Sequence, residues 1–147
     1  MAGALDFTIM SLVLLLAFTV FYFAALIILM LIYSLIRYGS SSFAARNWFE
    51  AVKAALIAAV MNNISMAIIA LIVLNEFVKG GIAGINAGIG IVNSPAAITE
   101  FAAYAAKKML VLSSVSVTVW LIASAGICFL LVRRKERKVA AKGRGKN

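Results

Sequence analysis

Residues 7–36 read FTIMSLVLLLAFTVFYFAALIILMLIYSLI, a stretch that holds no charged side chain between Asp6 and Arg37. A helix needs about 20 apolar residues to cross a bilayer core of about 30 Å, so this stretch can cross a membrane and must tilt or protrude. Gly39 can close the helix in a left-handed conformation, and the three serines that follow can turn the chain. We therefore predict a first transmembrane helix over residues 7–37.

The composition is that of a membrane protein. The chain has 147 residues, of which 65% are hydrophobic, and its mean hydropathy is +1.07, whereas soluble domains are about 45–50% apolar. Histidine is absent and Cys128 is the one cysteine, so the usual ligand sets for zinc, haem and iron–sulfur clusters are missing, as are triads built on histidine. We expect no metal, no cofactor and no enzymatic activity.

A second uncharged run follows the serine turn. Residues 43–53 mix aromatic and charged side chains, so we predict a helix that lies at the membrane surface or leads straight into the next span. The second span is predicted over residues 54–78. Polar groups inside hydrocarbon are costly unless they are paired, so the polar residues near its middle should face another helix or a polar path. These residues are Asn62, Asn63 and Ser65.

The third span is predicted over residues 109–132. Ser94 and Pro95 form a helix start signal, and the helix over 95–108 continues without a breaker into this span. A basic run then closes the span, as expected of a stop-transfer boundary. The predicted fold is therefore all-α, with a helical membrane domain over residues 1–132 and a basic cytoplasmic tail over residues 133–147.

Small residues recur every fourth position on the predicted helices, where they would allow close helix packing. In the second span they are Ala55, Ala59, Asn63 and Ala67, and in the third span the corresponding face holds Ser116, Trp120, Ser124 and Cys128. The glycine-rich apolar connector over residues 80–92 carries a possible glycine zipper of Gly80, Gly84 and Gly88. This connector can be a helix with a packing groove, or a re-entrant or buried loop.

Basic residues indicate the orientation of the chain. Arg37, Arg46 and Lys53 follow the first span and the basic tail follows the third, so both should be cytoplasmic and the amino terminus outside. Lysines flanking the glycine-rich connector weaken this asymmetry, and an arrangement with two deep crossings is the alternative. The tail residues that can anchor the topology, hold anionic lipid or bind nucleic acid are Arg133, Arg134, Lys135, Arg137 and Lys138.

These patterns favour a non-catalytic membrane subunit that acts by helix–helix self-association or as a small subunit of a larger membrane complex. Its expected partners are membrane lipids and protein chains, and the lack of aromatic residues among the tail charges argues against a single-strand nucleic-acid binder. One alternative is a pore or transporter component whose polar path is lined by Asn62, Asn63 and Ser65. Another is a lattice-forming hydrophobic subunit of a pilus or virion.

Overall fold

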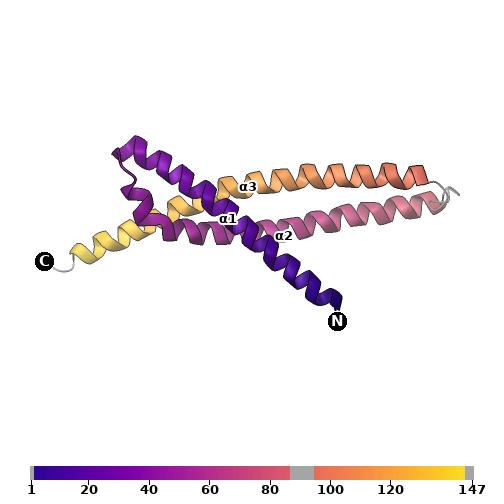
Figure 1. Ribbon diagram of the computed structural model, residues 1–147, viewed down its shortest axis with the longest axis horizontal. Helices are drawn as coiled ribbons and strands as arrows, with labels where there is room; N and C mark the ends of the chain where they lie inside the picture. The colour runs from indigo at the N-terminus through magenta and orange to yellow at the C-terminus, as the bar shows by residue number, and fades with distance from the viewer. Residues whose placement is uncertain (1, 87–94, 145–147) are drawn as a thin grey trace. The chain divides into compact units, whose positions relative to one another are not determined.

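Three long helices form the whole described structure (Figure 1). The computed structural model describes residues 2–86 and 95–144. Helix α1 spans Ala2–Tyr38, α2 spans Ser42–Asn86 and α3 spans Pro95–Arg144. The described residues contain no strand, which agrees with the predicted all-α fold.

Local sequence signals set the helix boundaries where they were expected. Gly39 has a φ angle of 64°, and its amide donates a 3.0 Å hydrogen bond to the carbonyl of Leu35, which closes the last turn of α1. The serine turn follows, and α2 begins at Ser42. Helix α3 begins at Pro95, whose fixed φ and missing amide suit the first helical position.

The helices are long enough and apolar enough to cross a membrane. The candidate spans are Thr8–Tyr38, Ser42–Glu76 and Ala102–Lys142. At a rise of 1.5 Å per residue, the complete helices are about 56, 68 and 75 Å long, so each exceeds a bilayer core of about 30 Å. The three apolar helices indicate a multi-pass membrane protein.

Helix α2 runs past both ends of the predicted second span. Residues 43–53 form its first turns, so the segment leads straight into the span. Its last turns include Gly80 and Gly84, so the first part of the glycine-rich stretch is helix and no separate connector is seen there. Helical backbone satisfies its own hydrogen bonds, which makes glycine more tolerable in apolar surroundings. Gly88 lies outside the described residues.

Helix α3 also extends beyond its predicted span, and the basic segment is part of it up to Arg144. The sequence supports this continuation, because residues 133–142 consist of lysine, arginine, glutamate, alanine and one valine, most of which favour helix. The basic residues therefore have fixed angular positions on a helix. A separate tail is not distinguished in the described part of the chain.

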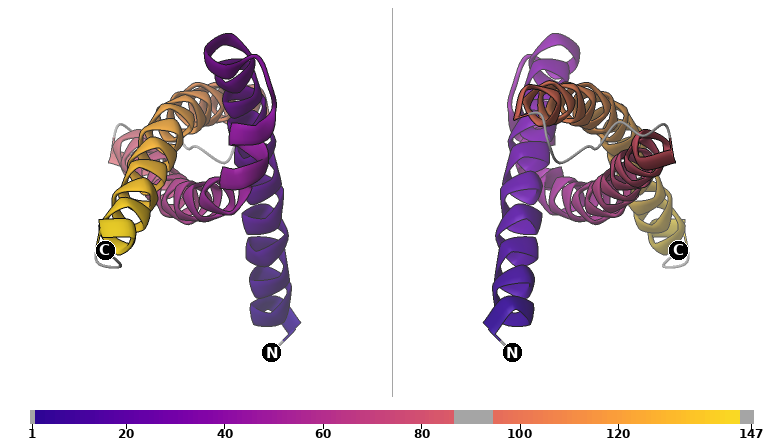
Figure 2. Two further views of the ribbon diagram at one scale, coloured as in Figure 1. Left: turned by 90° about the vertical axis from the view of Figure 1, so that its left-hand side faces the viewer. Right: turned by 90° about the vertical axis from the view of Figure 1, so that its right-hand side faces the viewer.

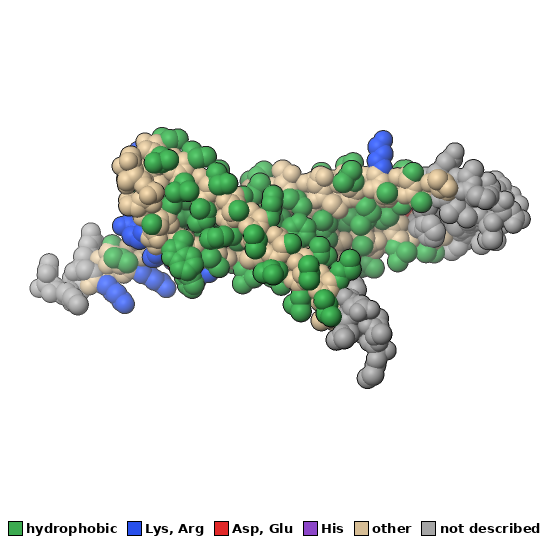
Figure 3. Space-filling model, viewed as in Figure 1, with side chains coloured by type: hydrophobic (Ala, Val, Ile, Leu, Met, Phe, Trp, Pro, Cys, Tyr) green, Lys and Arg blue, Asp and Glu red, His purple; other side chains and the backbone are tan. Residues whose placement is uncertain are grey.

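The structure divides into two compact units, which we describe separately. The first joins Met1–Asn63 with Val119–Asn147, and the second is Ile64–Thr118. In the first unit, all three helices pack together, with the start of α2 beside the end of α1 (Figure 2). Hydrophobic side chains cover the visible face of α1, and lysine and arginine side chains gather along the end of α3 (Figure 3).

Candidate functional site

Small side chains of α2 build the core of the first unit. The fully buried alanines of this helix are Ala51, Ala54, Ala55, Ala58 and Ala59. They pack in one cluster with Tyr22, Leu26 and Met30 of α1. An alanine has no side chain beyond Cβ, so a facing helix can approach closely and bring larger side chains into van der Waals contact.

The small-residue face of α3 completes this core. Ser124 is fully buried, Cys128 is buried with its Sγ 3.8 Å from Sδ of Met30, and Trp120 is partly buried against the cluster. Ser124 donates a hydrogen bond to the carbonyl of Leu121 on its own helix. Ser124 and Cys128 therefore pack within the chain, and Trp120 does so in part.

A set of polar contacts joins α2 to the end of α3. The Nζ of Lys135 donates to the carbonyl of Arg46 at 2.8 Å and to Oδ1 of Asn47 at 3.3 Å. Asn47 is 1% exposed, and its Nδ2 donates to the carbonyl of Phe43 at 3.1 Å. Arg46 and Glu136 also approach to 4.0 Å, but both are largely exposed, so this ion pair contributes little.

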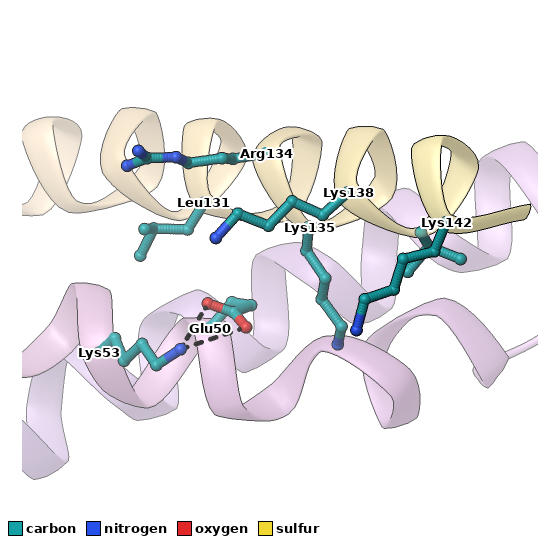
Figure 4. Close-up of a pocket in the computed structure, with 8 residues that line it drawn as sticks. Glu50, Lys53, Leu131, Arg134, Lys135, Lys138 and Lys142 are labelled. Atoms are coloured by element: carbon teal, nitrogen blue, oxygen red, sulfur yellow. Dashed lines mark hydrogen bonds and ion pairs between the residues drawn. The ribbon is translucent and has the colours of Figure 1, made fainter. Parts of the chain in front are cut away.

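Beside these contacts lies a pocket between α2 and α3 with a volume of about 460 Å³. We call it the basic pocket, and its lining residues are Glu50, Lys53, Leu131, Arg134, Lys135, Lys138, Val139 and Lys142. Figure 4 shows Lys135 and Lys142 pointing from α3 toward α2, where Glu50 and Lys53 lie. Leu131, Lys135, Lys138 and Lys142 share one helical face because they follow each other at intervals of three or four residues.

Glu50 is the one carboxylate that lines the basic pocket, and it already forms an ion pair. Its side chain is 10% exposed and forms an ion pair with Lys53, one helical turn away, with 3.2 Å between Oε2 of Glu50 and Nζ of Lys53. The same Nζ lies 4.5 Å from the centre of the Phe49 ring, a cation–π distance. Glu50 therefore offsets the charge of Lys53 and leaves the basic residues of α3 without a carboxylate partner in this pocket.

A second pocket, of about 560 Å³, lies between α1 and α3. Its walls are mainly apolar and include Leu26, Met30 and Phe129. Three aromatic rings stand at one end, with centroids 5.4 to 6.2 Å apart. They are Tyr33, Tyr38 and Phe43. This groove offers no cluster of like charges, because Arg133 and Glu136 line it together.

In the second unit, an ion pair joins the two helices. Lys108 of α3 donates to the Glu76 carboxylate of α2, and its Nζ lies 5.8 Å from the centre of the Tyr104 ring. Ser116 of the same unit is 8% exposed. Both ionic groups are partly exposed, so the pair orients the helices more than it stabilises them.

The polar residues predicted in the second span differ in burial. Asn62 is fully buried, whereas Asn63 and Ser65 are half-buried. These residues line neither the basic pocket, nor the pocket between α1 and α3, nor a third pocket on α3 around Arg133 and Arg137. In the described part of the chain, no three histidine, cysteine, aspartate or glutamate side chains come together as metal ligands.

The predicted basic tail residues separate onto two faces of α3. Arg134, Lys135 and Lys138 line the basic pocket, whereas Arg133 and Arg137 line another pocket, of about 320 Å³, to which Arg134 also contributes. The sequence prediction did not place Glu50 and Lys53 of α2 beside the basic residues of α3. A usable signal was present, because Asn47, Glu50, Ala51, Ala54 and Ala58 share one helical face that combines small and polar residues.

No family model, curated protein or solved structure matches this chain.

Proposed function

We propose that the protein is a non-catalytic, multi-pass membrane subunit that works by helix–helix association, either with its own copies or in a larger membrane complex. The observation that carries the proposal is the small internal coverage of the helices. Only 11%, 17% and 22% of the residues are buried in the most apolar windows of the three spans. Most of each helix surface must therefore contact lipid or other protein chains.

The start of α1 shows this lack of internal contacts most clearly. Every described residue from Thr8 to Leu14 is exposed, and the side chains include Met10, Leu12 and Val13. The buried polar side chains Ser34 and Ser124 are engaged in hydrogen bonds to backbone carbonyls of the chain itself. These two buried hydroxyls thus serve packing, and the exposed surface of the spans is mostly apolar, which suits association better than chemistry.

The association can be tested with polymer-bounded membrane discs excised directly from the native membrane, without detergent. Native mass spectrometry of these particles should show more than one copy of the chain, or the chain together with other proteins. A closed ring, a filament fragment and a mixed complex would have different masses, so the measurement also separates the forms of association. Particles that hold one copy and no other protein would overturn the proposal.

Cysteine substitution locates the contact surface. In a Cys128→Ala background, Val13→Cys places a thiol on the exposed start of α1, and Ala54→Cys places one in the internal core. If like helices meet, oxidation in the membrane should join chains through position 13 and not through position 54. Cross-linking through position 54 alone would contradict the internal core as described.

We also propose that the amino terminus is outside and that the end of α3 is cytoplasmic. The basic pocket brings Lys53 of α2 together with the basic residues of α3, and Arg46 pairs with Glu136 beside it. One end of the first unit therefore concentrates positive charge, and such ends lie on the cytoplasmic side of membranes. Three crossings then place the amino terminus on the other side.

Single cysteines in the Cys128→Ala background test this orientation. A membrane-impermeant maleimide should label Ser40→Cys, in the turn before α2, only after the cells are opened. It should label Thr8→Cys, near the start of α1, in intact cells. The reverse pattern would show that the chain is inverted, and labelling of both positions from one side would show that α1 does not cross the membrane.

A further inference from the structure

We propose that the basic pocket binds the phosphate of an anionic phospholipid headgroup. Five basic side chains and one carboxylate line this pocket. The carboxylate of Glu50 is paired with Lys53, and within the described part of the chain no ion pair involves Arg134, Lys138 or Lys142. The pocket therefore holds positive charge that its own residues do not neutralise.

Lys135 holds together the two helices that form the pocket, and its hydrogen-bond partners do not neutralise its positive charge. Its two hydrogen-bond acceptors, the carbonyl of Arg46 and the amide oxygen of Asn47, are both neutral. The contacts hold α3 against the first turns of α2, so the pocket exists before any anion enters. Lys138 and Lys142 lie one and two turns further along the same face, where their flexible ammonium groups can close on a phosphate.

The size and walls of the pocket favour a lipid over a free anion. Its volume of about 460 Å³ lies within the range of small-molecule sites, about 300–1,000 Å³. Leu131 and Val139 add apolar surface beside the charges. The long apolar run of α3 ends at Val132, within this stretch, so the pocket lies where hydrocarbon gives way to headgroups. A phospholipid presents a phosphate next to apolar chains, which matches both features.

Nucleic acid has phosphates but does not fit the pocket as well. Single-stranded binders combine basic residues with aromatic rings on which bases stack. The residues lining the basic pocket include no aromatic side chain. The charges also adjoin the apolar span of α3.

The test compares two double variants that remove the same charge from different faces of α3. Lys138→Gln with Lys142→Gln removes two charges from the basic pocket, and Arg133→Gln with Arg137→Gln removes two charges that lie outside its lining. The full-length protein in neutral detergent is titrated with phosphatidylglycerol, and native mass spectrometry counts the lipids that remain bound. The first variant should weaken retention about tenfold or more, and the second much less.

Three further measurements make the result decisive. Lys138→Arg with Lys142→Arg should retain the lipid, because the charge is kept. Phosphatidylcholine should be retained poorly by the unmodified protein, and inorganic phosphate at millimolar concentration should not displace phosphatidylglycerol. Equal losses in the two glutamine variants, equal retention of the neutral lipid, or displacement by inorganic phosphate would overturn the proposal. So would pocket-dependent binding of a single-stranded oligonucleotide by protein that does not retain phosphatidylglycerol.

Discussion

Replacing Ala59 with leucine tests the internal core directly. Ala59 is fully buried on α2, in the cluster that includes Tyr22, Leu26 and Met30 of α1. Leucine adds three carbons at a site where the helices are in contact, and such overpacking costs about 1–3 kcal/mol. Ala67→Leu is the matched control, because the same substitution is made on the same helix at an exposed position.

The expected change in melting temperature follows from this cost. For chains of about 150 residues, 1 kcal/mol shifts the midpoint by about 2–4 °C, so Ala59→Leu should melt about 2–12 °C below the unmodified protein. Ala67→Leu should stay close to it. The shift would be smaller if α1 moves aside to admit the new side chain.

The single cysteine provides the assay. Cys128 is 4% exposed and lies against Met30 in the same core, so a maleimide that fluoresces on reaction stays dark until the core opens. The protein is heated in mild detergent with this reagent, and fluorescence is followed against temperature. An unchanged midpoint for Ala59→Leu, or a larger drop for Ala67→Leu, would refute the packing of α2 in the first unit. Rapid labelling before heating would show that Cys128 is not buried.

Two further substitutions test the polar contacts. Lys135→Met removes the hydrogen bonds to Arg46 and Asn47 and should lower stability by about 1 kcal/mol in the same thiol assay. Lys138→Met, which breaks no described hydrogen bond, should not, and equal effects would argue against the contacts. Glu76→Lys should lower the midpoint of helix melting by circular dichroism, and adding Lys108→Glu should restore it by rebuilding the ion pair. Failure of the second change to restore the midpoint would contradict the pairing of α2 with α3 in the second unit.

Local signals were sufficient to predict the helices. The uncharged stretches exceed what a crossing needs, and the glycine and proline signals at positions 39 and 95 operate on the backbone within a few residues. The carboxyl-terminal ends of α2 and α3 were predicted less accurately, because a helix continues until a helix-breaking residue such as proline stops it, and neither predicted end has a proline. Lysine, arginine and alanine after Val132 extend a helix as readily as they form a soluble tail.

The packing partners could not be predicted from spacing. Ala55, Ala59 and Ala67 are equivalent in the sequence pattern, yet the first two are fully buried and the third is exposed. The difference depends on where other helices reach along α2, which a four-residue repeat does not specify. Ser124 and Cys128 were likewise recognised as packing residues, while the spacing left open whether their partner is the same chain or another.

The basic pocket required information from two distant segments. The sequence showed that residues 133–138 are mostly basic. Which of them face α2 depends on their angular positions around α3, and charge alone does not give these positions. Glu50 and Asn47 appeared in the sequence as parts of an interfacial helix. Their roles depend on the approach of α3, which brings Lys135 to a residue 88 positions away in sequence.

Polar contacts at the end of the first unit also influence how α2 and α3 align along their lengths. Lipid is as apolar as leucine, so a leucine gains little free energy when it moves from lipid to a contact with another helix. Leucine contacts therefore favour one alignment of two helices only weakly over the next. The bond from Lys135 to Asn47 depends on the alignment, because sliding α3 by one turn, about 5.4 Å, in one direction would bring Leu131 to the place of Lys135 and lose the bond. The alanines of α2 permit close approach at several alignments, and the lysine disfavours the alignment that would place Leu131 beside Asn47. The same alignment brings Lys138 and Lys142 of α3 into one pocket with Glu50 and Lys53 of α2, so the contact between Lys135 and Asn47 also holds the basic pocket together.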